Sequence, residues 1–214
     1  MALKPQEAAL RAQLRDARRV VVKIGSQALC QPDGRLDSRV VAGLCQDLCA
    51  LLEAGRQVVL VSSGAVASGA GELGLERGEL GKQALAAIGQ PLLMARYRQE
   101  FAIGRRHVAQ VLLTHADLGD RGRFLPARRV LGELLAAGIV PIVNENDTVA
   151  VDELKFGDND QLAAQVAHLV EADVLVILTE VDGLYSANPH THADARLLTW
   201  VGAKDQQALA AAES

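Results

Sequence analysis

Two runs of acids and amides carry the clearest chemical signal in the chain. NENDT occupies residues 144–148, directly behind the apolar run 138–143, and GDND follows at residues 157–160. In open α/β sheets, the loops that leave the carboxyl ends of strands form the ligand sites. The alternative is a pair of ordinary Asx turns in which Asp158 caps a helix. A cap needs one aspartate, whereas these runs hold several carboxylates and amides, so we predict a site here.

A lysine near the end of the first apolar run could bind a phosphate. Residues 20–26 read VVVKIGS, so Lys23 is closely followed by Gly25 and Ser26. Backbone N–H groups at a glycine turn beside an ammonium group favour phosphate binding. A structural lysine, with its stem packed and its ammonium group in water, fits the same pattern equally well. The Rossmann and Walker phosphate motifs are both missing from the sequence, which excludes those two readings.

Residues 61–65 read VSSGA and repeat this arrangement after the second apolar run. Ser63 could simply cap the following helix. Taken together with Lys23, its hydroxyl would offer a donor to phosphate or carboxylate oxygens, while the Asp and Asn side chains of residues 144–160 suit an ammonium group. An amino acid beside a nucleotide phosphate would satisfy both sets. Residues 178–189, behind the last apolar run, could line the base and ribose.

The elements that would position these side chains alternate along the chain. Apolar runs predict strands at residues 20–22, 58–61, 108–113, 139–143 and 174–178, and apolar residues at three-to-four spacing predict helices at 38–54, 82–103, 121–137 and 159–171. Gly55 and Gly138 follow two of these helices as expected for C-terminal caps. Buried strands separated by helices predict an α/β fold, a three-layer αβα sandwich with a mainly parallel open sheet. The glycine-rich stretch 69–81 reads as an excursion or lid outside the sheet.

Composition excludes several classes of partner. The chain has 214 residues, a net charge of −4 and 3% aromatic residues, which argues against nucleic acid and anionic membranes. Residues 1–19 lack a secretory apolar core and no stretch is long enough to cross a membrane, so we expect a cytoplasmic protein. Cys30, Cys45 and Cys49 predict core thiols, with Cys45 and Cys49 on one helix face, and no metal site is expected.

The chain resembles the amino-acid kinase family, and the resemblance is colinear across most of its length. It is carried by VVKIGS at 21–26, SSGA at 62–65, KQALAAIGQ at 82–90, QVLLT at 110–114, RFL at 123–125, PIVNEND at 141–147, FGDND at 156–160 and GLY at 183–185. The pair of NEND and GDND loops resembles the members that phosphorylate L-glutamate. Members acting on acetylglutamate, aspartate or uridylate do not share both loops.

The resemblance implies a nucleotide site and a catalytic lysine. Lys23 would contact the transferred phosphoryl group, Gly25 and Ser26 would supply donors around the phosphates, and Thr179 and Glu180 would lie along the nucleotide. The family carries Asp at the position of Glu180. ATP would be the co-substrate, together with Mg²⁺.

The resemblance also implies the substrate site and the reaction. Ser63, Asp147 and Asn159 would hold L-glutamate, and Asp160 would orient the cationic side chains. The product would be γ-glutamyl phosphate, formed in the first step of proline biosynthesis. The acceptor carboxylate is already ionised at neutral pH, so no general base is needed and catalysis reduces to alignment and charge neutralisation. Family membership further implies a homo-oligomer, with proline as a feedback inhibitor.

Two alternatives remain at the level of the sequence. The family continues beyond the position of Ser214 with a serine- and glycine-rich nucleotide loop that holds a second lysine, so we expect residues 1–214 to be an amino-acid kinase domain incomplete at its C-terminus, without the family's RNA-binding-like accessory domain. An inactive fragment, or a non-catalytic module that binds glutamate or proline, is therefore one alternative. Another amino-acid kinase specificity is the other.

Overall fold

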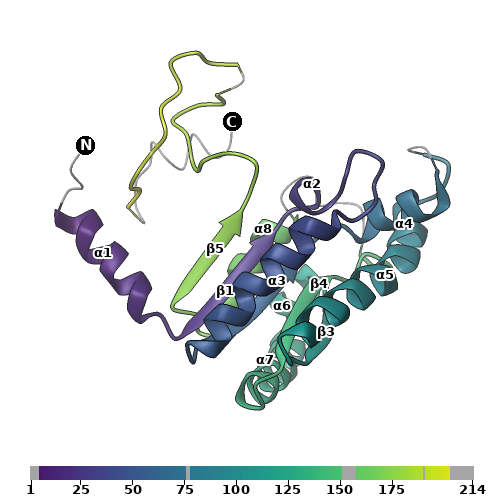
Figure 1. Ribbon diagram of the computed structural model, residues 1–214, viewed down its shortest axis with the longest axis horizontal. Helices are drawn as coiled ribbons and strands as arrows, with labels where there is room; N and C mark the ends of the chain where they lie inside the picture. Colours follow the sequence, from purple (N-terminus) through teal and green to yellow (C-terminus); the bar gives the residue numbers. More distant parts are fainter. Residues whose placement is uncertain (1–4, 76–77, 151–157, 190, 203–214) are drawn as a thin grey trace. The chain divides into compact units, whose positions relative to one another are not determined.

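The computed structural model describes residues 5–75, 78–150, 158–189 and 191–202 (Figure 1). The chain divides into a larger unit, Leu14–Leu178, and a smaller unit that combines Met1–Gln13 with Thr179–Ser214. The sheet and both hydrophobic clusters lie in the larger unit. In the smaller unit, an antiparallel bridge between Tyr185 and Leu197 joins two stretches of chain.

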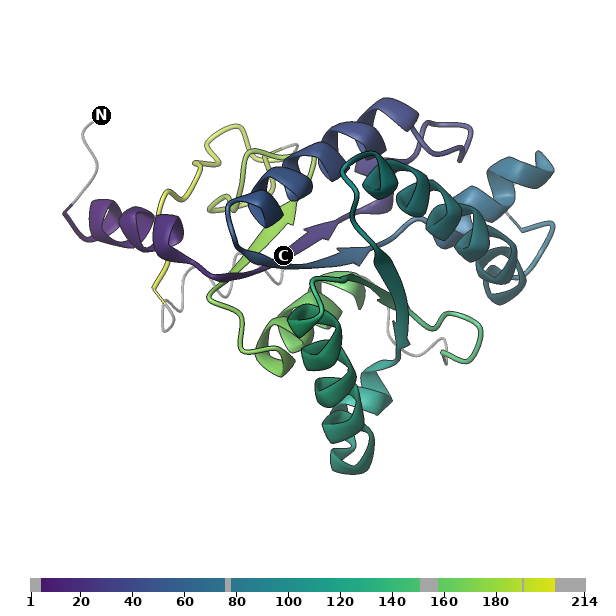
Figure 2. The ribbon, with the colours of Figure 1, turned by 60° about the horizontal axis from the view of Figure 1, so that its bottom comes forward.

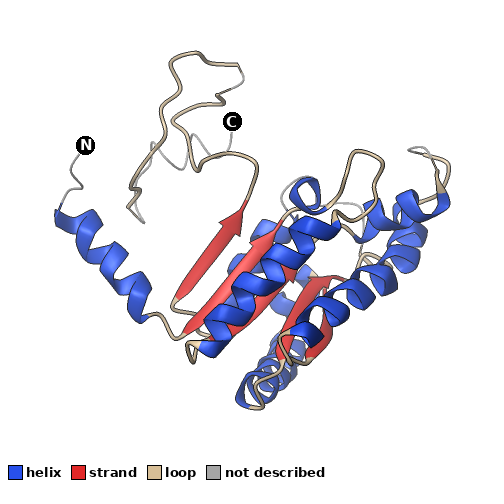
Figure 3. Ribbon diagram, viewed as in Figure 1, coloured by secondary structure: helices blue, strands red, loops and turns tan. Residues whose placement is uncertain are grey.

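Five parallel strands form the sheet of the larger unit, in the order β3-β4-β2-β1-β5 (Figure 3). The strands are β1 (Arg19–Ile24), β2 (Gln57–Ser62), β3 (Val108–Leu113), β4 (Val140–Glu145) and β5 (Val174–Leu178). The helices are α1 (Pro5–Asp16), α2 (Ser26–Leu29), α3 (Ser38–Glu53), α4 (Ala65–Leu73), α5 (Lys82–Ile103), α6 (His115–Gly119), α7 (Arg121–Ala136) and α8 (Asp158–Leu169).

Alternating strand residues pack on opposite faces of the sheet, because successive side chains of a strand point to opposite sides. Val20 and Val22 belong to a hydrophobic cluster with residues of α3 and α5. Val21 belongs to a second cluster with residues of α7 and α8. Figure 2 shows α3 and α5 on one side of the strands and α7 and α8 on the other. The predicted three-layer α/β fold is confirmed.

Local capping defines where several helices begin and end. The Asp37 carboxylate accepts hydrogen bonds from the N–H groups of Arg39 and Val40 at the start of α3. Gly55 and Gly138 adopt φ of +78° and +69° behind α3 and α7, which confirms both as C-terminal caps because glycine takes the left-handed conformation without steric cost.

The predicted elements differ from the observed ones mainly at their ends. All five strands and four long helices are present, most with bounds shifted by one or two residues. The largest consequence is in β4, which continues through Asn144 and Glu145, two residues that we had placed in a loop. The helices α1, α2 and α6 were not predicted. The prediction that all five strands are buried is wrong for β3 and β5, which are partly exposed because they stand at the two ends of the strand order.

The described residues of the stretch 69–81 lie outside the sheet as predicted, but residues 69–73 are part of α4 rather than a lid. Two glycines allow α4 to pack directly on α5. A Cβ atom at Gly89 would lie 1.8 Å from the Ala65 carbonyl oxygen, and one at Gly69 would lie 2.0 Å from the Leu85 carbonyl oxygen. Only glycine permits this approach, so the start of α4 is held against the middle of α5.

The remaining expectations concern thiols and surfaces. Cys45 and Cys49 are free, buried thiols on one face of α3, and burial raises the pKa of Cys45 to about 12. Among the described helices, none combines the length and apolarity that a bilayer crossing needs.

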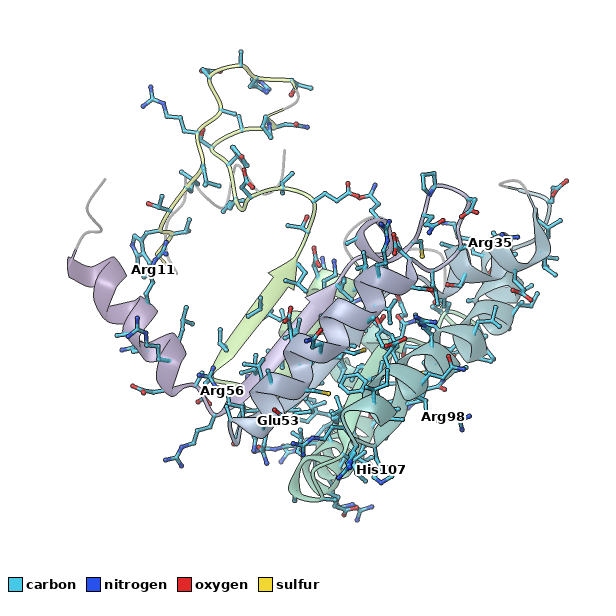
Figure 4. All side chains as sticks on the ribbon, viewed as in Figure 1. Arg11, Arg35, Glu53, Arg56, Arg98 and His107 are labelled. Atoms are coloured by element: carbon cyan, nitrogen blue, oxygen red, sulfur yellow. The ribbon has the colours of Figure 1, made fainter. Side chains whose placement is uncertain are left out.

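At the amino ends of the strands, where Figure 4 labels Arg56 and His107, the Arg56 guanidinium donates to the Arg15 carbonyl oxygen at 2.8 Å.

Candidate active site

Lys23 and Asp160 form an ion pair at the carboxyl edge of the sheet. Lys23 follows Val21 by two residues on β1, so its side chain lies on the face covered by α8. Asp160 is the third residue of α8, and its Oδ1 lies 2.5 Å from the Lys23 Nζ. The lysine side chain is 12% exposed and the aspartate side chain 49% exposed. A largely buried ammonium group is thus held in place by a carboxylate that solvent still reaches.

The glycine turn behind β1 lies directly beside this ammonium group. Gly25 is the N-cap of the short helix α2, and a Cβ atom placed on it would lie 3.5 Å from the Lys23 Nζ. Ser26, half-buried, is the first residue of α2. The structure therefore brings Lys23, Gly25 and Asp160 together, and the phosphate-binding role of Lys23, Gly25 and Ser26 stays a prediction.

Ser63 and Asn159 make the second contact across this edge. The Asn159 amide nitrogen donates to the Ser63 Oγ at 2.5 Å. Asn159 precedes Asp160 on α8, so two consecutive residues of one helical turn make the two contacts. The alternative in which Ser63 caps α4 is wrong: Gly64, with φ of +102°, is the N-cap, and no side chain caps this helix.

Asn144 links this contact to the interior. Its side chain is buried, and its Oδ1 accepts hydrogen bonds from the Glu145 N–H at 2.9 Å and from the Asn159 Nδ2 at 3.3 Å. Its own Nδ2 donates to the Gln90 Oε1 on α5 at 2.8 Å. Gln90, Asn144, Asn159 and Ser63 thus form a continuous chain of hydrogen bonds, which we call the amide chain.

The amide chain spans the switch point of the sheet. The neighbouring strands β2 and β4 lead to helices on opposite faces, since β2 continues into α4 and α5 and β4 continues into α8. Ligands of open α/β sheets bind where adjacent strands send their connections to opposite sides. Ser63 follows β2 and Asn144 ends β4, so the amide chain crosses this point.

Gln90 and Asn144 are site residues for which the sequence alone predicted no role. The position of Asn144 at the end of a buried strand is a signal for a buried amide. Gln90 shares one buried face of α5 with Leu93, Tyr97 and Phe101, all apolar or aromatic. A glutamine within such a stripe requires a hydrogen-bond partner, and that was the available signal.

Comparison with known proteins identifies the family. The profile of the amino acid kinase family matches residues 18–213. The chain belongs to this family. Among similar proteins, the glutamate 5-kinases of Pelobacter propionicus, Ralstonia nicotianae and Thermobifida fusca are 52%, 51% and 51% identical over 87%, 94% and 91% of this chain. The same alignments cover 51%, 55% and 51% of those proteins, so the chain spans about half the length of the curated relatives it matches.

The resemblance to amino acid kinases implied roles for three further residues. Asp147 is half-buried in the turn directly behind β4, where the Asn146 side chain accepts a hydrogen bond from Thr148 at 2.6 Å. Thr179 and Glu180 belong to the smaller unit. Gly157 and the side chain of Asp158 lie outside the described residues. The substrate role of Asp147 and the nucleotide role of Thr179 and Glu180 stay predictions.

The Cys30 thiol lies close to this edge and is protonated at neutral pH. Cys30 follows α2, and a Cβ atom at Gly64 would lie 3.3 Å from its sulfur. Burial raises the pKa of the Cys30 thiol, which keeps it protonated at neutral pH. The described contacts bring together the ammonium group of Lys23, the carboxylate of Asp160, the hydroxyl of Ser63 and the amides of Gln90, Asn144 and Asn159.

Proposed function

We propose that the protein transfers the γ-phosphoryl group of ATP to the side-chain carboxylate of L-glutamate, forming γ-glutamyl phosphate. The observation that carries this proposal is the pairing of Lys23 with Asp160 directly beside the contact of Ser63 with Asn159. The first pair suits a phosphoryl group, and the second suits an amino acid. The relatives named glutamate 5-kinase support the choice of glutamate.

The hydrogen-bond polarity of the second pair suits an amino acid. Because the Ser63 oxygen accepts from Asn159, the Ser63 hydroxyl keeps its own proton to donate to a substrate carboxylate. Both sites of the Asn159 Nδ2 group are used within the protein, and its Oδ1 has no partner in the described part of the chain. That oxygen would accept from the substrate ammonium group, with the carboxylate of Asp147 as a second partner.

Catalysis would rest on alignment and charge. Lys23 would neutralise the phosphoryl oxygens during transfer, and the donors of Gly25 and Ser26 would hold the phosphates. Asp160 would keep the lysine ammonium group in position. An ionised carboxylate attacks without losing a proton, which agrees with a site that contains no histidine among the residues it brings together.

Mg²⁺ is part of this proposal as a companion of the nucleotide. Within the described ranges, no group of three or more His, Cys, Asp or Glu side chains could hold a metal ion. Mg²⁺ that arrives with ATP needs only one or two protein carboxylates, because phosphates and water fill its other positions. The half-exposed Asp160 fits that requirement. When bound, the ion would neutralise charge on the phosphates.

Glutamate-dependent release of ADP tests the proposal on the full chain. We expect ADP release from ATP and Mg²⁺ to require L-glutamate and to be absent with L-glutamine, whose side chain cannot accept a phosphoryl group in the same way. No dependence on glutamate would overturn the kinase assignment. Calorimetry with L-glutamate and with L-proline separates the alternatives, since binding without turnover would favour a regulatory module.

Other expectations of the family stay predictions. They are inhibition by proline, assembly into a homo-oligomer and a cytoplasmic location. The assignment of glutamate within the family is tested by Asp147→Ala. We expect the affinity for L-glutamate to fall while that for ATP is unchanged, and an unchanged glutamate affinity would favour another amino-acid specificity.

A further inference from the structure

Gln90 lies one step behind the residues that would touch a substrate. It is 8% exposed on α5, and its Oε1 accepts the hydrogen bond from the Asn144 amide nitrogen. Neither the resemblance to the family nor the proposed function gives Gln90 a role. Its partner Asn144 is 1% exposed, so this hydrogen bond lies in the interior. There, a different orientation of the Asn144 amide would leave a polar group without a partner, which is costly.

The polarity of the whole amide chain follows from one backbone group. The Glu145 N–H can only donate, so the atom of Asn144 that faces it must be Oδ1. The Nδ2 group of Asn144 then faces α5 and requires an acceptor, which Gln90 provides. With Oδ1 on the other side, Asn144 presents an acceptor to Asn159, and the Asn159 amide must turn its Nδ2 toward it.

The consequence reaches the substrate-facing atoms. With its Nδ2 donating to Asn144 and Ser63, Asn159 leaves its Oδ1 buried and without a partner in the described residues. We propose that Gln90 is a positioning residue: its acceptor holds the Asn144 amide in the orientation that the Glu145 N–H selects, and Asn144 in turn orients Asn159, so that an acceptor and the Ser63 hydroxyl donor face an amino acid. This inference rests on the proposed function and adds a residue to its specificity.

The packing of α4 on α5 reinforces this arrangement. Gly89, which precedes Gln90, lies against the Ala65 carbonyl oxygen at the start of α4, two residues behind Ser63. One turn of α5 therefore positions both partners of Asn159: Ser63 through the backbone of α4, and Asn144 through the side chain of Gln90. The two sides of the amide chain share one rigid support.

Replacement of Gln90 by methionine tests the inference. Gln90→Met keeps the length of the side chain and removes its acceptor, so the Asn144 Nδ2 group loses its partner and the amide is held from its oxygen side alone. We expect the Kd for L-glutamate, measured by calorimetry on the full chain, to rise about tenfold while the Kd for ATP stays unchanged. Gln90→Glu restores an acceptor and should bring the glutamate Kd within about threefold of wild type.

Gln57→Met is the matched control. Gln57 is the first residue of β2, at the opposite end of that strand from Ser63, and its Oε1 accepts a partly buried hydrogen bond from the Arg19 Nε at 2.9 Å. The same substitution there removes an acceptor outside the amide chain. We expect a lower unfolding midpoint with an unchanged glutamate Kd. If Gln57→Met weakened glutamate binding as much as Gln90→Met, the effect would be general destabilisation and the positioning role would be overturned.

A second measurement separates this inference from the proposed function. In NMR spectra of the ¹⁵N-labelled chain, the side-chain NH₂ protons of Asn159 should exchange slowly with water, because both are hydrogen-bonded, and should exchange faster in Gln90→Met. If the wild-type protein failed to bind glutamate, the proposed function would be contradicted, whereas the amide chain would not be. Unchanged exchange, or an unchanged glutamate Kd in a binding-competent protein, would overturn the role of Gln90.

Discussion

At the scale of residues, two consecutive side chains of α8 organise the candidate site. Asn159 reaches Ser63 behind β2, and Asp160 reaches Lys23 on β1. Lys23 can make its contact because the alternation of β1 places it on the α8 face, two residues after the buried Val21. The first turn of α8 thus joins the Lys23 contact, proposed to bind a phosphate, to the Ser63 contact, proposed to bind an amino acid.

Loss of the lysine ammonium group should abolish most of the activity. In Lys23→Met, we expect the rate of glutamate-dependent ADP release to fall on the order of 100-fold or more, because the site loses its preorganised positive charge. The unfolding midpoint should change little, since the Asp160 partner is half-exposed and can be hydrated. Activity assays and thermal unfolding check both statements.

The control for this variant removes an ion pair elsewhere. Arg128→Met breaks the exposed pair between Arg128 and Glu171, which follows the C-terminal end of α8. Its activity should equal that of wild type. A Lys23→Met protein with activity within a few-fold of wild type would remove Lys23 from the catalytic role proposed for it.

At the scale of elements, the contact of α4 with α5 depends on glycine. A Cβ atom at Gly89 would lie 1.8 Å from the Ala65 carbonyl oxygen and 2.5 Å from the Gly69 nitrogen. Both atoms belong to the backbone, so no side-chain movement relieves the overlap. In Gly89→Ala we expect a loss of about 3 kcal/mol in the free energy of unfolding, measured with chemical denaturant.

Gly132→Ala is the matched control, in the middle of the exposed face of α7. A Cβ atom there would meet nothing within 4 Å. Alanine should therefore stabilise the protein by about 0.5–1 kcal/mol, the difference in helix propensity. Equal effects of the two substitutions would contradict the close packing of α4 on α5.

The start of β5 is tied to β1 by a carboxylate that responds to pH. The Asp173 Oδ2 accepts hydrogen bonds from the N–H groups of Arg19 and Arg18 at 2.8 and 2.7 Å, and these bonds lower the pKa of the Asp173 carboxyl below its usual range. A lowered native pKa means that the carboxylate stabilises the fold above its unfolded pKa of about 4, and that this contribution disappears as the pH falls through the native value.

Asp173→Asn should remove this dependence. Its unfolding midpoint should lie below that of wild type at about pH 6, and the gap should narrow as the pH falls to about 3, because the wild-type carboxyl becomes protonated. Asp117, whose pKa is lowered mainly by its hydrogen bond from Arg123, titrates in both proteins and cancels from the comparison. A gap that stays constant with pH would show that charge at Asp173 does not matter.

At the scale of the whole molecule, the apolar core and the amide chain both lie within residues 17–178. The smaller unit contributes no member to either hydrophobic cluster of the described residues. We therefore expect a chain that ends at Leu178 to unfold in denaturant with the same midpoint and slope as the full chain. It should keep its affinity for L-glutamate, while ATP affinity should fall if Thr179 and Glu180 lie along the nucleotide. A lower midpoint would mean that residues beyond 178 support the core.

Much of this arrangement could be predicted from the sequence, because periodicity and residue type act locally. The apolar runs predicted the five strands, and the positions of Lys23, Ser63 and Asn159 behind or within them predicted a shared edge. Local pattern could not predict the glycine contact between α4 and α5 or the pairing of Gln90 with Asn144, because both depend on which elements meet. Nor could it distinguish edge strands from central ones.

The sequence by itself determined the α/β alternation, the caps at Gly55 and Gly138 and the polar residue types gathered behind the strands, since each follows from hydrophobic spacing or backbone preference. Only the tertiary structure decided that Asn144 meets Gln90, that Lys23 meets Asp160, and which way the amides of Asn144 and Asn159 are turned. The reason is that the oxygen and the NH₂ group of a side-chain amide are similar in shape, whereas the oxygen accepts hydrogen bonds and the NH₂ group donates them. Its orientation is set by the partners that packing brings to it, here the Glu145 N–H and Gln90 from α5.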